Sequence, residues 1–229
     1  MPTPPQSRFR RPRAIVFDLD GTLVDSALDL AATLNRLLER HGRTAVALAD
    51  VRNMIGEGAA KLVERGFNKT GGMPNGSWTL EKLTVDFLAD YSRAVALHTR
   101  PFPHVVDSLE RFARAGIAMG VCTSKAGALT RQLLAELDLT RHFAAVAGGD
   151  DVPARKPDPS HVMHVLERMG VNADDAIYVG DSETDVKTAR AANLPVILVT
   201  FGYTPVPPRE LGADAVIDSF SELPALVQV

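Results

Sequence analysis

The chain has 229 residues, with 25 lysines and arginines against 28 aspartates and glutamates, and therefore a formal net charge of −3. This balance provides no basic field for nucleic acid or an anionic membrane, so we expect neither as a partner. The length accommodates one large domain, or a core that carries a smaller insert. The single cysteine, Cys122, excludes an intramolecular disulfide, and no apolar run or secretory signal is evident, so we expect a cytoplasmic protein.

Six short apolar segments are predicted to be strands: 14–17, 118–122, 144–147, 176–179, 196–199 and 215–217. Their unbroken apolar character is typical of strands covered on both faces, as in parallel sheets. Helical patterns accompany them at 105–114, 126–137, 159–169 and 183–191, with stops predicted at Gly116, Gly170 and Asn193. This alternation predicts an α/β fold with a Rossmann-like open parallel sheet.

Between about residues 25 and 99 the pattern changes to helical periodicities without strands. One apolar stripe comprises Leu28, Leu30, Ala31, Leu34, Leu37 and Leu38, and another comprises Leu80, Leu83, Phe87, Leu88, Tyr91 and Val95. We predict a small all-helical cap, residues 25–99, inserted into a Rossmann-like core of residues 1–24 and 100–229, whose residues 1–12 form a disordered tail. The alternative is a long connection within one domain, although such connections are ordinarily much shorter.

The first predicted strand ends in an acidic cluster, Asp18-Leu-Asp20-Gly-Thr22. In an extended chain Asp18 and Asp20 point the same way, at the carboxyl edge where open α/β sheets bind ligands. Two carboxylates about 4 Å apart repel by about 4 kcal/mol at an effective dielectric of 20, so a proton or a cation must offset the repulsion. The alternative is a strand that ends in turn-forming aspartates.

A second acidic cluster, Gly180-Asp181-Ser-Glu-Thr-Asp185, follows another predicted strand. Asp181 and Asp185 share a face if a helix begins here, although an aspartate or serine before a helix is also an ordinary N-cap. Both clusters lie at strand carboxyl ends, where they can meet. Several hard carboxylate ligands without a Cys/His cluster favour Mg²⁺ over zinc.

Two further segments can bind phosphate. Thr123-Ser-Lys125 follows the Cys122 strand and offers hydroxyl and backbone N–H groups, although Ser and Thr frequent such turns in any case. Lys156 precedes a predicted helix; opposite the acidic groups it provides a phosphate-binding charge, and elsewhere it is an ordinary surface lysine.

Taken in order, these elements resemble the haloacid dehalogenase superfamily. The residues similar to its four motifs are Asp18-x-Asp20-Gly-Thr-Leu, Thr123, Lys156 and Gly180-Asp181-Ser-x-x-Asp185. The match spans nearly the whole chain beyond the first residues. The helical insert is similar to that family's small α-helical cap.

The resemblance implies a mechanism. Asp18 is the expected nucleophile, which attacks phosphorus and forms an aspartyl-phosphate. Asp20 is the expected general acid and base. Dehalogenase and phosphonatase relatives lack an aspartate at the position of Asp20, so its presence favours phosphate esters.

The resemblance also implies a metal site and a phosphate site. The expected Mg²⁺ ligands are the Asp18 carboxylate, the Asp20 main-chain carbonyl and Asp181. Asp185 is expected either to bind the ion directly or to support the residues that do. The residues expected to hold the phosphoryl oxygens are Thr123, Ser124 and Lys156.

Within the superfamily, three segments resemble phosphoglycolate phosphatases: Leu23-Val-Asp-Ser26, Ile55-Gly-Glu-Gly-Ala59 and Val216-Ile-Asp-Ser-Phe-Ser-Glu-Leu-Pro224. The implied reaction is the hydrolysis of 2-phosphoglycolate, a small phosphorylated metabolite, by a monomer or homodimer. Ser124 departs from that group, which often has asparagine there. The alternatives are a phosphatase or mutase for another small sugar phosphate, and a non-catalytic phospho-binding domain.

The cap is expected to contact the substrate. Gly56 and Gly58 flank a turn that can approach the ligand closely, so Gly56 is a candidate binding residue; the alternative is a plain helix N-terminus. Because phosphoglycolate carries a carboxylate, its site requires a second cationic or N–H-rich pocket. The candidate cap cations are Arg52, Lys61 and Arg65.

Overall fold

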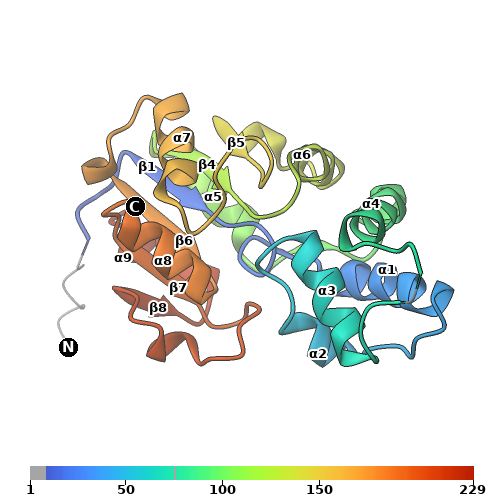
Figure 1. Ribbon diagram of the computed structural model, residues 1–229. Coiled ribbons are helices and arrows are strands. Elements are labelled where there is room, and N and C mark those ends of the chain that lie inside the picture. Colours follow the sequence, from blue (N-terminus) through green and yellow to red (C-terminus); the bar gives the residue numbers. More distant parts are fainter. Residues whose placement is uncertain (1–8, 75) are drawn as a thin grey trace.

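The computed structural model describes residues 9–74 and 76–229. Six parallel strands form one sheet in the order β5-β4-β1-β6-β7-β8 (Figure 1). In chain order these strands are β1 (Ala14–Phe17), β4 (Ala118–Cys122), β5 (Ala145–Ala147), β6 (Ala176–Gly180), β7 (Val196–Val199) and β8 (Ala215–Ile217). All six predicted strands are therefore present, and the predicted Rossmann-like sheet is confirmed.

Helices cover both faces of the sheet, which explains why its strands are apolar throughout. Ala14 and Val16 of β1 belong to the apolar cluster under α7 (Pro159–Met169) and α8 (Glu183–Ala191). Ile15 and Phe17, which alternate with them, belong to the cluster on the other side. The helices of that side are α5 (Val105–Arg114), α6 (Gly127–Glu136) and α9 (Leu223–Leu226). Elsewhere along the core, short 3-10 helices lie in the connections at η2 (Thr140–His142), η3 (Ala173–Asp175), η4 (Pro208–Glu210) and η5 (Phe220–Glu222).

The helix ends follow local signals. Three of the four predicted core helices have the predicted limits, and α6 is one residue shorter at each end. Gly170 ends α7 in the left-handed conformation, with φ of 66°, which glycine adopts without steric cost. The stops predicted at Gly116 and Asn193 also have positive φ, 72° and 56°. At the start of α7, Asp158 accepts a hydrogen bond of 2.9 Å from the backbone N–H of Ser160.

The stretch between β1 and β4 is helical, and we call α1 to η1 the helical segment. It begins and ends at two short strands that pair antiparallel, β2 (Val24–Asp25) and β3 (Arg100–Pro101). Figure 1 shows these helices to one side of the sheet. Its elements are α1 (Ala27–Arg40), α2 (Leu48–Arg52), α3 (Ala59–Lys69), α4 (Leu80–Tyr91) and η1 (Ser92–Ala94). The division into core and cap domains at residues 25 and 99 stays a prediction.

The helical segment has its own packed interior, continuous with one face of the sheet. Leu34, Leu37, Phe87 and Tyr91 are almost completely buried there. Leu28 departs from its predicted stripe, because 49% of its surface is exposed. At 3.6 residues per turn, Leu28 lies on the opposite side of α1 from Leu37, so its inclusion in the stripe was wrong.

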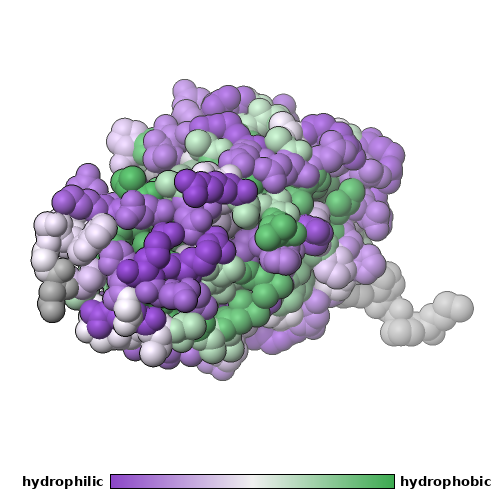
Figure 2. Space-filling model, turned by 90° about the vertical axis from the view of Figure 1, so that its right-hand side faces the viewer, coloured by the Kyte–Doolittle hydropathy of each residue, from purple (hydrophilic) through white to green (hydrophobic). Residues whose placement is uncertain are grey.

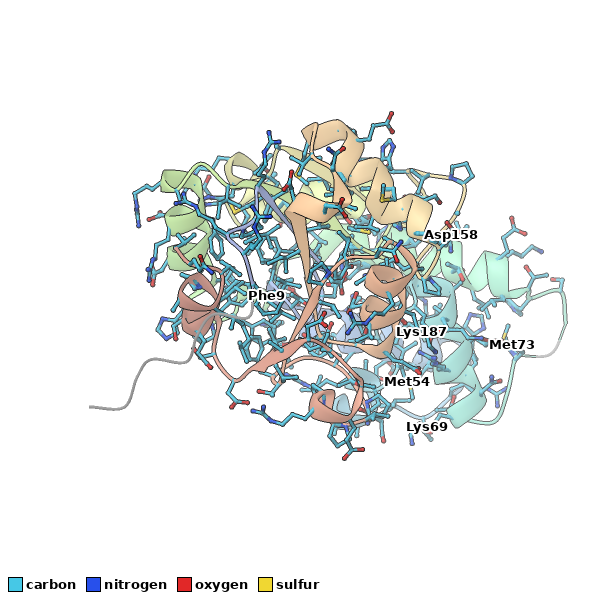
Figure 3. The ribbon with its side chains drawn as sticks, turned by 90° about the vertical axis from the view of Figure 1, so that its left-hand side faces the viewer. Phe9, Met54, Lys69, Met73, Asp158 and Lys187 are labelled. Carbon is cyan, nitrogen blue, oxygen red and sulfur yellow. The ribbon has the colours of Figure 1, made fainter. Side chains whose placement is uncertain are left out.

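The predicted disordered tail comprises residues 1–12, of which residues 1–8 lie outside the described residues. The remaining residues are packed. Phe9 is buried, and its carbonyl accepts a hydrogen bond of 2.6 Å from Gln228 Nε2. Arg11 donates to the Ala115 carbonyl at 2.6 Å. The expected tail therefore does not extend through residue 12. Figure 3 shows Phe9 on the sheet side of the molecule, away from Met54 and the rest of the helical segment.

The surface is mostly hydrophilic on the face that Figure 2 shows, with smaller hydrophobic areas between the polar ones. The large apolar residues that are exposed are Leu28, Trp78, Val85, Leu97, Met163 and Val206. Among the residues described, no helix combines the length and the apolar character that crossing a bilayer requires.

Helix α7 packs closely against the sheet at Gly120 of β4, where a larger residue would not fit. A Cβ atom at this position of β4 would lie 2.5 Å from Val165 Cγ1 and 3.1 Å from Met169 Sδ. We predict that Gly120→Ala lowers the free energy of unfolding by about 1–3 kcal/mol through overpacking, as measured by urea denaturation. The control is Gly42→Asn, at an open position with φ of 66° that asparagine tolerates. Equal stability of the two variants would contradict the prediction.

Candidate active site

Three neighbouring strands bring the sequence motifs to one edge. Because β4, β1 and β6 are adjacent and parallel, the residues that follow them meet at the carboxyl edge of the sheet. Asp18 continues from β1 and donates its backbone N–H to the Val179 carbonyl at 2.9 Å. Thr123 continues from β4 and donates to the Ala147 carbonyl at 3.1 Å. Asp181 directly follows β6.

The acidic side chains gather at this edge as predicted. Carboxylate oxygens of Asp18, Asp181 and Asp185 all lie within 4.8 Å of one another, and all three residues are buried. Burial raises the pKa of Asp18 to about 6, although Lys156 opposes the shift. Burial and the charges of Asp185 and Asp18 hold the pKa of Asp181 well above its usual range. The cluster is therefore short of positive charge.

Lys156 is the cation of this cluster. Its Nζ atom lies 2.9 Å from Asp18 Oδ1 and 2.8 Å from Asp185 Oδ1, and its side chain is 1% exposed. Although burial favours the neutral amine, the charges of Asp18 and Asp185 raise the pKa of Lys156, so it stays protonated. One lysine faces three carboxylates, so the cluster as it stands favours a further cation or a retained proton.

Asp185 differs from the other two carboxylates because its oxygens are fully engaged. Oδ1 accepts from Lys156 Nζ and from Tyr178 OH at 3.1 Å. Oδ2 accepts from the backbone N–H groups of Asp181 and Ser182, each at 3.1 Å, and from Ser182 Oγ at 2.7 Å. Burial opposes its ionisation, but Lys156 and these donors hold its pKa below the ordinary value. Ser182 and Asp185 also form the capping box that starts α8.

Asp181 is held by loops from two other parts of the chain. Its Oδ1 accepts from Thr22 Oγ1 at 3.2 Å and its Oδ2 from the Tyr203 backbone N–H at 2.5 Å. Gly21 permits this approach: its φ is 90°, and a Cβ there would lie 2.5 Å from Asp181 Oδ2. By contrast, Asp18 Oδ1 is buried without a hydrogen bond of acceptable geometry, although Lys156 lies within ion-pair distance. The ammonium of Lys156 is thus the contact that this oxygen makes, and a metal cation would be a second partner for it.

Asp20 belongs to a separate polar group at the same edge. Ser26 Oγ donates to Asp20 Oδ1 at 2.5 Å, and Lys125 Nζ lies 3.1 and 3.2 Å from its two oxygens. Lys125 also donates to Tyr91 OH, in α4, at 2.9 Å. Burial would favour the neutral amine, but Asp20 and Tyr91 raise the pKa of Lys125, which therefore carries its charge.

A cavity opens onto both polar groups and extends under the helical segment. Its polar lining comes from the sheet edge and comprises Asp18, Asp20, Thr123, Ser124 and Lys125. Tyr91 adds a phenol, and Gly56 and Gly58 add backbone. The remaining lining is apolar and comprises Leu30, Ile55, Ala59, Leu62, Phe87, Leu88, Ala126 and Leu129.

The structure places Gly56 and Ser124 on this cavity, but Gly58 makes the closer approach. A Cβ at Gly58 would lie 3.2 Å from the Ser124 carbonyl, whereas one at Gly56 would have nothing within 4 Å. The three candidate cap cations do not line the cavity. Arg52 pairs with Asp25 at 2.9 Å, Lys61 with Glu64 at 2.7 Å, and Arg65 with Glu57.

Three residues of the site were missed from the sequence. Lys125 was named as part of the segment Thr123-Ser-Lys125, but its side chain was given no role, although its place directly after Thr123 and Ser124 was a usable signal. Tyr91 was interpreted only as part of an apolar helix stripe, and its phenol oxygen was the overlooked feature. Tyr203 contributes a backbone N–H to Asp181 from the loop after β7, for which no local pattern exists.

The parallel sheet and the carboxylates at its carboxyl edge define an α/β protein whose site lies at that edge, and comparison with known proteins identifies the family. The sequence model of the haloacid dehalogenase-like hydrolase family matches residues 15–199. The phosphoglycolate phosphatase of Agrobacterium fabrum is 41% identical over 224 residues, which cover 97% of this chain and 95% of that protein. That of Caulobacter vibrioides is 42% identical over 210 residues, 92% of this chain and 88% of that protein.

Solved structures show the same fold. The crystal structure of a predicted phosphoglycolate phosphatase from Haemophilus somnus has a TM-score of 0.90 at 26% identity, covering 95% of this chain and 99% of that one. CbbY from Rhodobacter sphaeroides, solved in complex with phosphate, has a TM-score of 0.81 at 24% identity, covering 95% and 100%, a likeness of fold alone. The chain belongs to the haloacid dehalogenase-like hydrolase family, which confirms the resemblance of its motifs.

The raised pKa of Asp18 predicts a pH-dependent stability. The folded protein binds this proton more tightly than the unfolded chain, whose ordinary value is 3.8, so without divalent ions stability falls as pH rises from about 4 to about 6. We expect about 2–3 kcal/mol from Asp18, because one pKa unit corresponds to about 1.4 kcal/mol. Urea denaturation in EDTA measures it as the difference between wild type and Asp18→Asn. Parallel pH curves for the two proteins would contradict this assignment.

Proposed function

We propose that the protein is a Mg²⁺-dependent phosphomonoester hydrolase that converts 2-phosphoglycolate to glycolate and phosphate. The observation that carries the proposal is the buried group of Asp18, Asp181, Asp185 and Lys156, which opens at Asp18 onto a cavity that also contains Asp20. The choice of substrate is supported by relatives about 40% identical that bear the name phosphoglycolate phosphatase.

Asp18 is the proposed nucleophile. Its carboxylate attacks phosphorus and forms an aspartyl-phosphate, and water then hydrolyses that ester. Lys156 Nζ, 2.9 Å from Asp18 Oδ1, keeps the side chain oriented and supports its ionised form. The same lysine, together with Thr123 and Ser124, neutralises charge on the transferring phosphoryl oxygens.

The residues of the cluster fit a magnesium ion. Carboxylate oxygens of Asp18 and Asp181 lie within 4.8 Å of each other in a buried place, and Lys156 is paired with Asp18 but not with Asp181, so these two carboxylates and the Asp20 main-chain carbonyl would hold the ion. When bound, Mg²⁺ would offset the negative charge of the carboxylates and of the phosphoryl group. Because five protein donors saturate Asp185, we assign it to holding Lys156 and the Asp181 loop rather than to direct ligation.

Asp20 is the proposed general acid and base. It lines the same cavity as Asp18, so it can protonate the leaving oxygen and later take a proton from the attacking water. Ser26 and Lys125 fix its carboxylate from two sides. Both contacts orient the group before the substrate arrives.

The helical segment is the proposed cap. It supplies the apolar wall of the cavity and approaches the sheet edge where Gly58 meets the Ser124 carbonyl. Closure of such a segment over the site excludes water from the reaction. The short paired strands β2 and β3 are the connections through which it would move.

Two alternatives predict other results. A phosphatase or mutase for a sugar phosphate would prefer sugar phosphates in a substrate panel, and a non-catalytic phospho-binding domain would release no phosphate. Asp20, Thr123 and Lys156 together argue against the second alternative, the non-catalytic domain.

We place the reaction in the cytoplasm because the single cysteine, Cys122, is buried and unpaired. The monomeric or dimeric state stays a prediction.

The proposal is tested by phosphate release from a panel of small phosphate esters with Mg²⁺ and with EDTA. We expect 2-phosphoglycolate to be the best substrate, EDTA to abolish turnover, and Asp18→Asn to lower kcat by at least about 10³-fold while the protein stays folded. Turnover that survives both treatments would exclude the proposed nucleophile and the proposed metal.

The role of Asp20 is tested by the leaving group. We expect Asp20→Asn to reduce kcat by about 10²–10⁴-fold with alkyl phosphates, because an alkoxide requires a proton. The loss should be smaller with 4-nitrophenyl phosphate, whose leaving group departs without one. Steady-state kinetics with both esters measures the difference, and an equal loss would argue against the acid role.

A further inference from the structure

We propose that Lys125 is the residue that selects the carboxylate of the substrate, held in place by Tyr91 of the helical segment. This inference rests on the proposed function. It adds the residue that binds the carboxylate of 2-phosphoglycolate, the end of the substrate that does not react. It replaces the three cap cations expected from the sequence, which pair elsewhere and do not line the cavity.

The first support is charge. Among the described residues that line the cavity, Lys125 is the one cationic side chain, and most of the wall beyond the sheet edge is apolar. A carboxylate that enters such a wall loses its water and must be paired to offset that cost. Lys125 is 5% exposed, so its own charge is already desolvated.

The second support is distance. Asp20 protonates the ester oxygen only from hydrogen-bond range, about 2.6–3.2 Å. In 2-phosphoglycolate the carboxylate carbon is two bonds from that oxygen. Lys125 Nζ lies 3.1 and 3.2 Å from the two oxygens of Asp20. A substrate placed for proton transfer from Asp20 therefore brings its carboxylate into the range of Lys125.

The third support is the way in which Lys125 is held. Tyr91 OH accepts from Nζ at 2.9 Å, and the ammonium lies 4.6 Å from the centre of the Tyr91 ring. Burial raises the pKa of Tyr91 to about 12, so the phenol stays neutral and can accept this bond. An ammonium has three donors, and two of its three acceptors here are the two oxygens of Asp20, so a substrate carboxylate can bind by taking over one of the Asp20 contacts while Tyr91 keeps Nζ in place.

The apolar wall adds selectivity against sugar phosphates. Leu30, Phe87, Leu88 and Leu129 offer no polar partner to the hydroxyls of a longer leaving group. Hydroxyl groups buried without partners lower affinity. A short ester with a carboxylate near the ester oxygen satisfies both Lys125 and this wall.

The test compares 2-phosphoglycolate with 2-hydroxyethyl phosphate, in which a neutral CH₂OH group replaces the carboxylate. With Mg²⁺ present, we expect Lys125→Met to lower kcat/KM for 2-phosphoglycolate by about 10²–10³-fold, mainly through KM. The loss with 2-hydroxyethyl phosphate, which reports only the effect of Lys125 on Asp20, should be at least about tenfold smaller, so the preference for the carboxylate falls. Lys125→Arg, which keeps the charge, should recover part of it.

Lys125→Gln provides the same comparison if Lys125→Met does not fold, because glutamine removes the charge and keeps a polar N–H donor on a slightly shorter side chain. The matched control is Lys69→Met, a surface lysine of α3 that pairs with Asp50 at 3.3 Å and is labelled in Figure 3. Its substrate preference should equal that of the wild type. Thermal denaturation of every variant establishes that it is folded.

The two possible failures are distinguishable. Equal losses on both esters would show that Lys125 acts only through Asp20, and no loss on either would show that it is not needed; both results overturn the inference and leave the proposed phosphatase intact. A wild-type enzyme that hydrolyses other phosphate esters but not 2-phosphoglycolate would overturn the proposed substrate, and the inference with it.

Discussion

The buried contact of Lys156 with Asp18 and Asp185 is the interaction on which the rest of the site depends. It joins the end of β1, the start of α7 and the start of α8 within one group of charges. Removing one partner from such a group typically costs about 3–5 kcal/mol, because the remaining charges stay buried. Asp185, once fixed by Lys156, binds the backbone of Asp181 and Ser182 in turn. The orientation of Asp18, the proposed nucleophile, and the shape of the loop at Asp181 therefore share one physical cause.

The same group is incomplete by itself. Three carboxylates lie close together and Lys156 pairs with two of them, and the raised pKa values of Asp18 and Asp181 express that imbalance. A fold that holds like charges together in a buried place has a high affinity for a cation there, because the cation relieves repulsion that the fold has already created. The proposed metal binding is thereby linked to the stability of the fold.

The two parts of the chain contribute different kinds of lining to the cavity. The carboxyl edge of the sheet provides the charged groups, and the helical segment provides most of the apolar wall. Lys125 and Tyr91 lie where these parts meet, so the pocket is complete only when the helices lie against the sheet.

Short-range patterns in the sequence determined the strands, most helix ends and the acidic edge. Apolar runs and stops such as Gly170 act over neighbouring residues, and the ends of adjacent parallel strands must share an edge, so Asp18 and Asp181 could be placed together in advance. The tertiary structure alone decided that Lys125 meets Asp20 and Tyr91, which are 105 and 34 residues away. It also decided that the arginines and lysine expected to read the substrate pair with nearby acids instead. Such pairings depend on how whole elements pack, and no local periodicity encodes them.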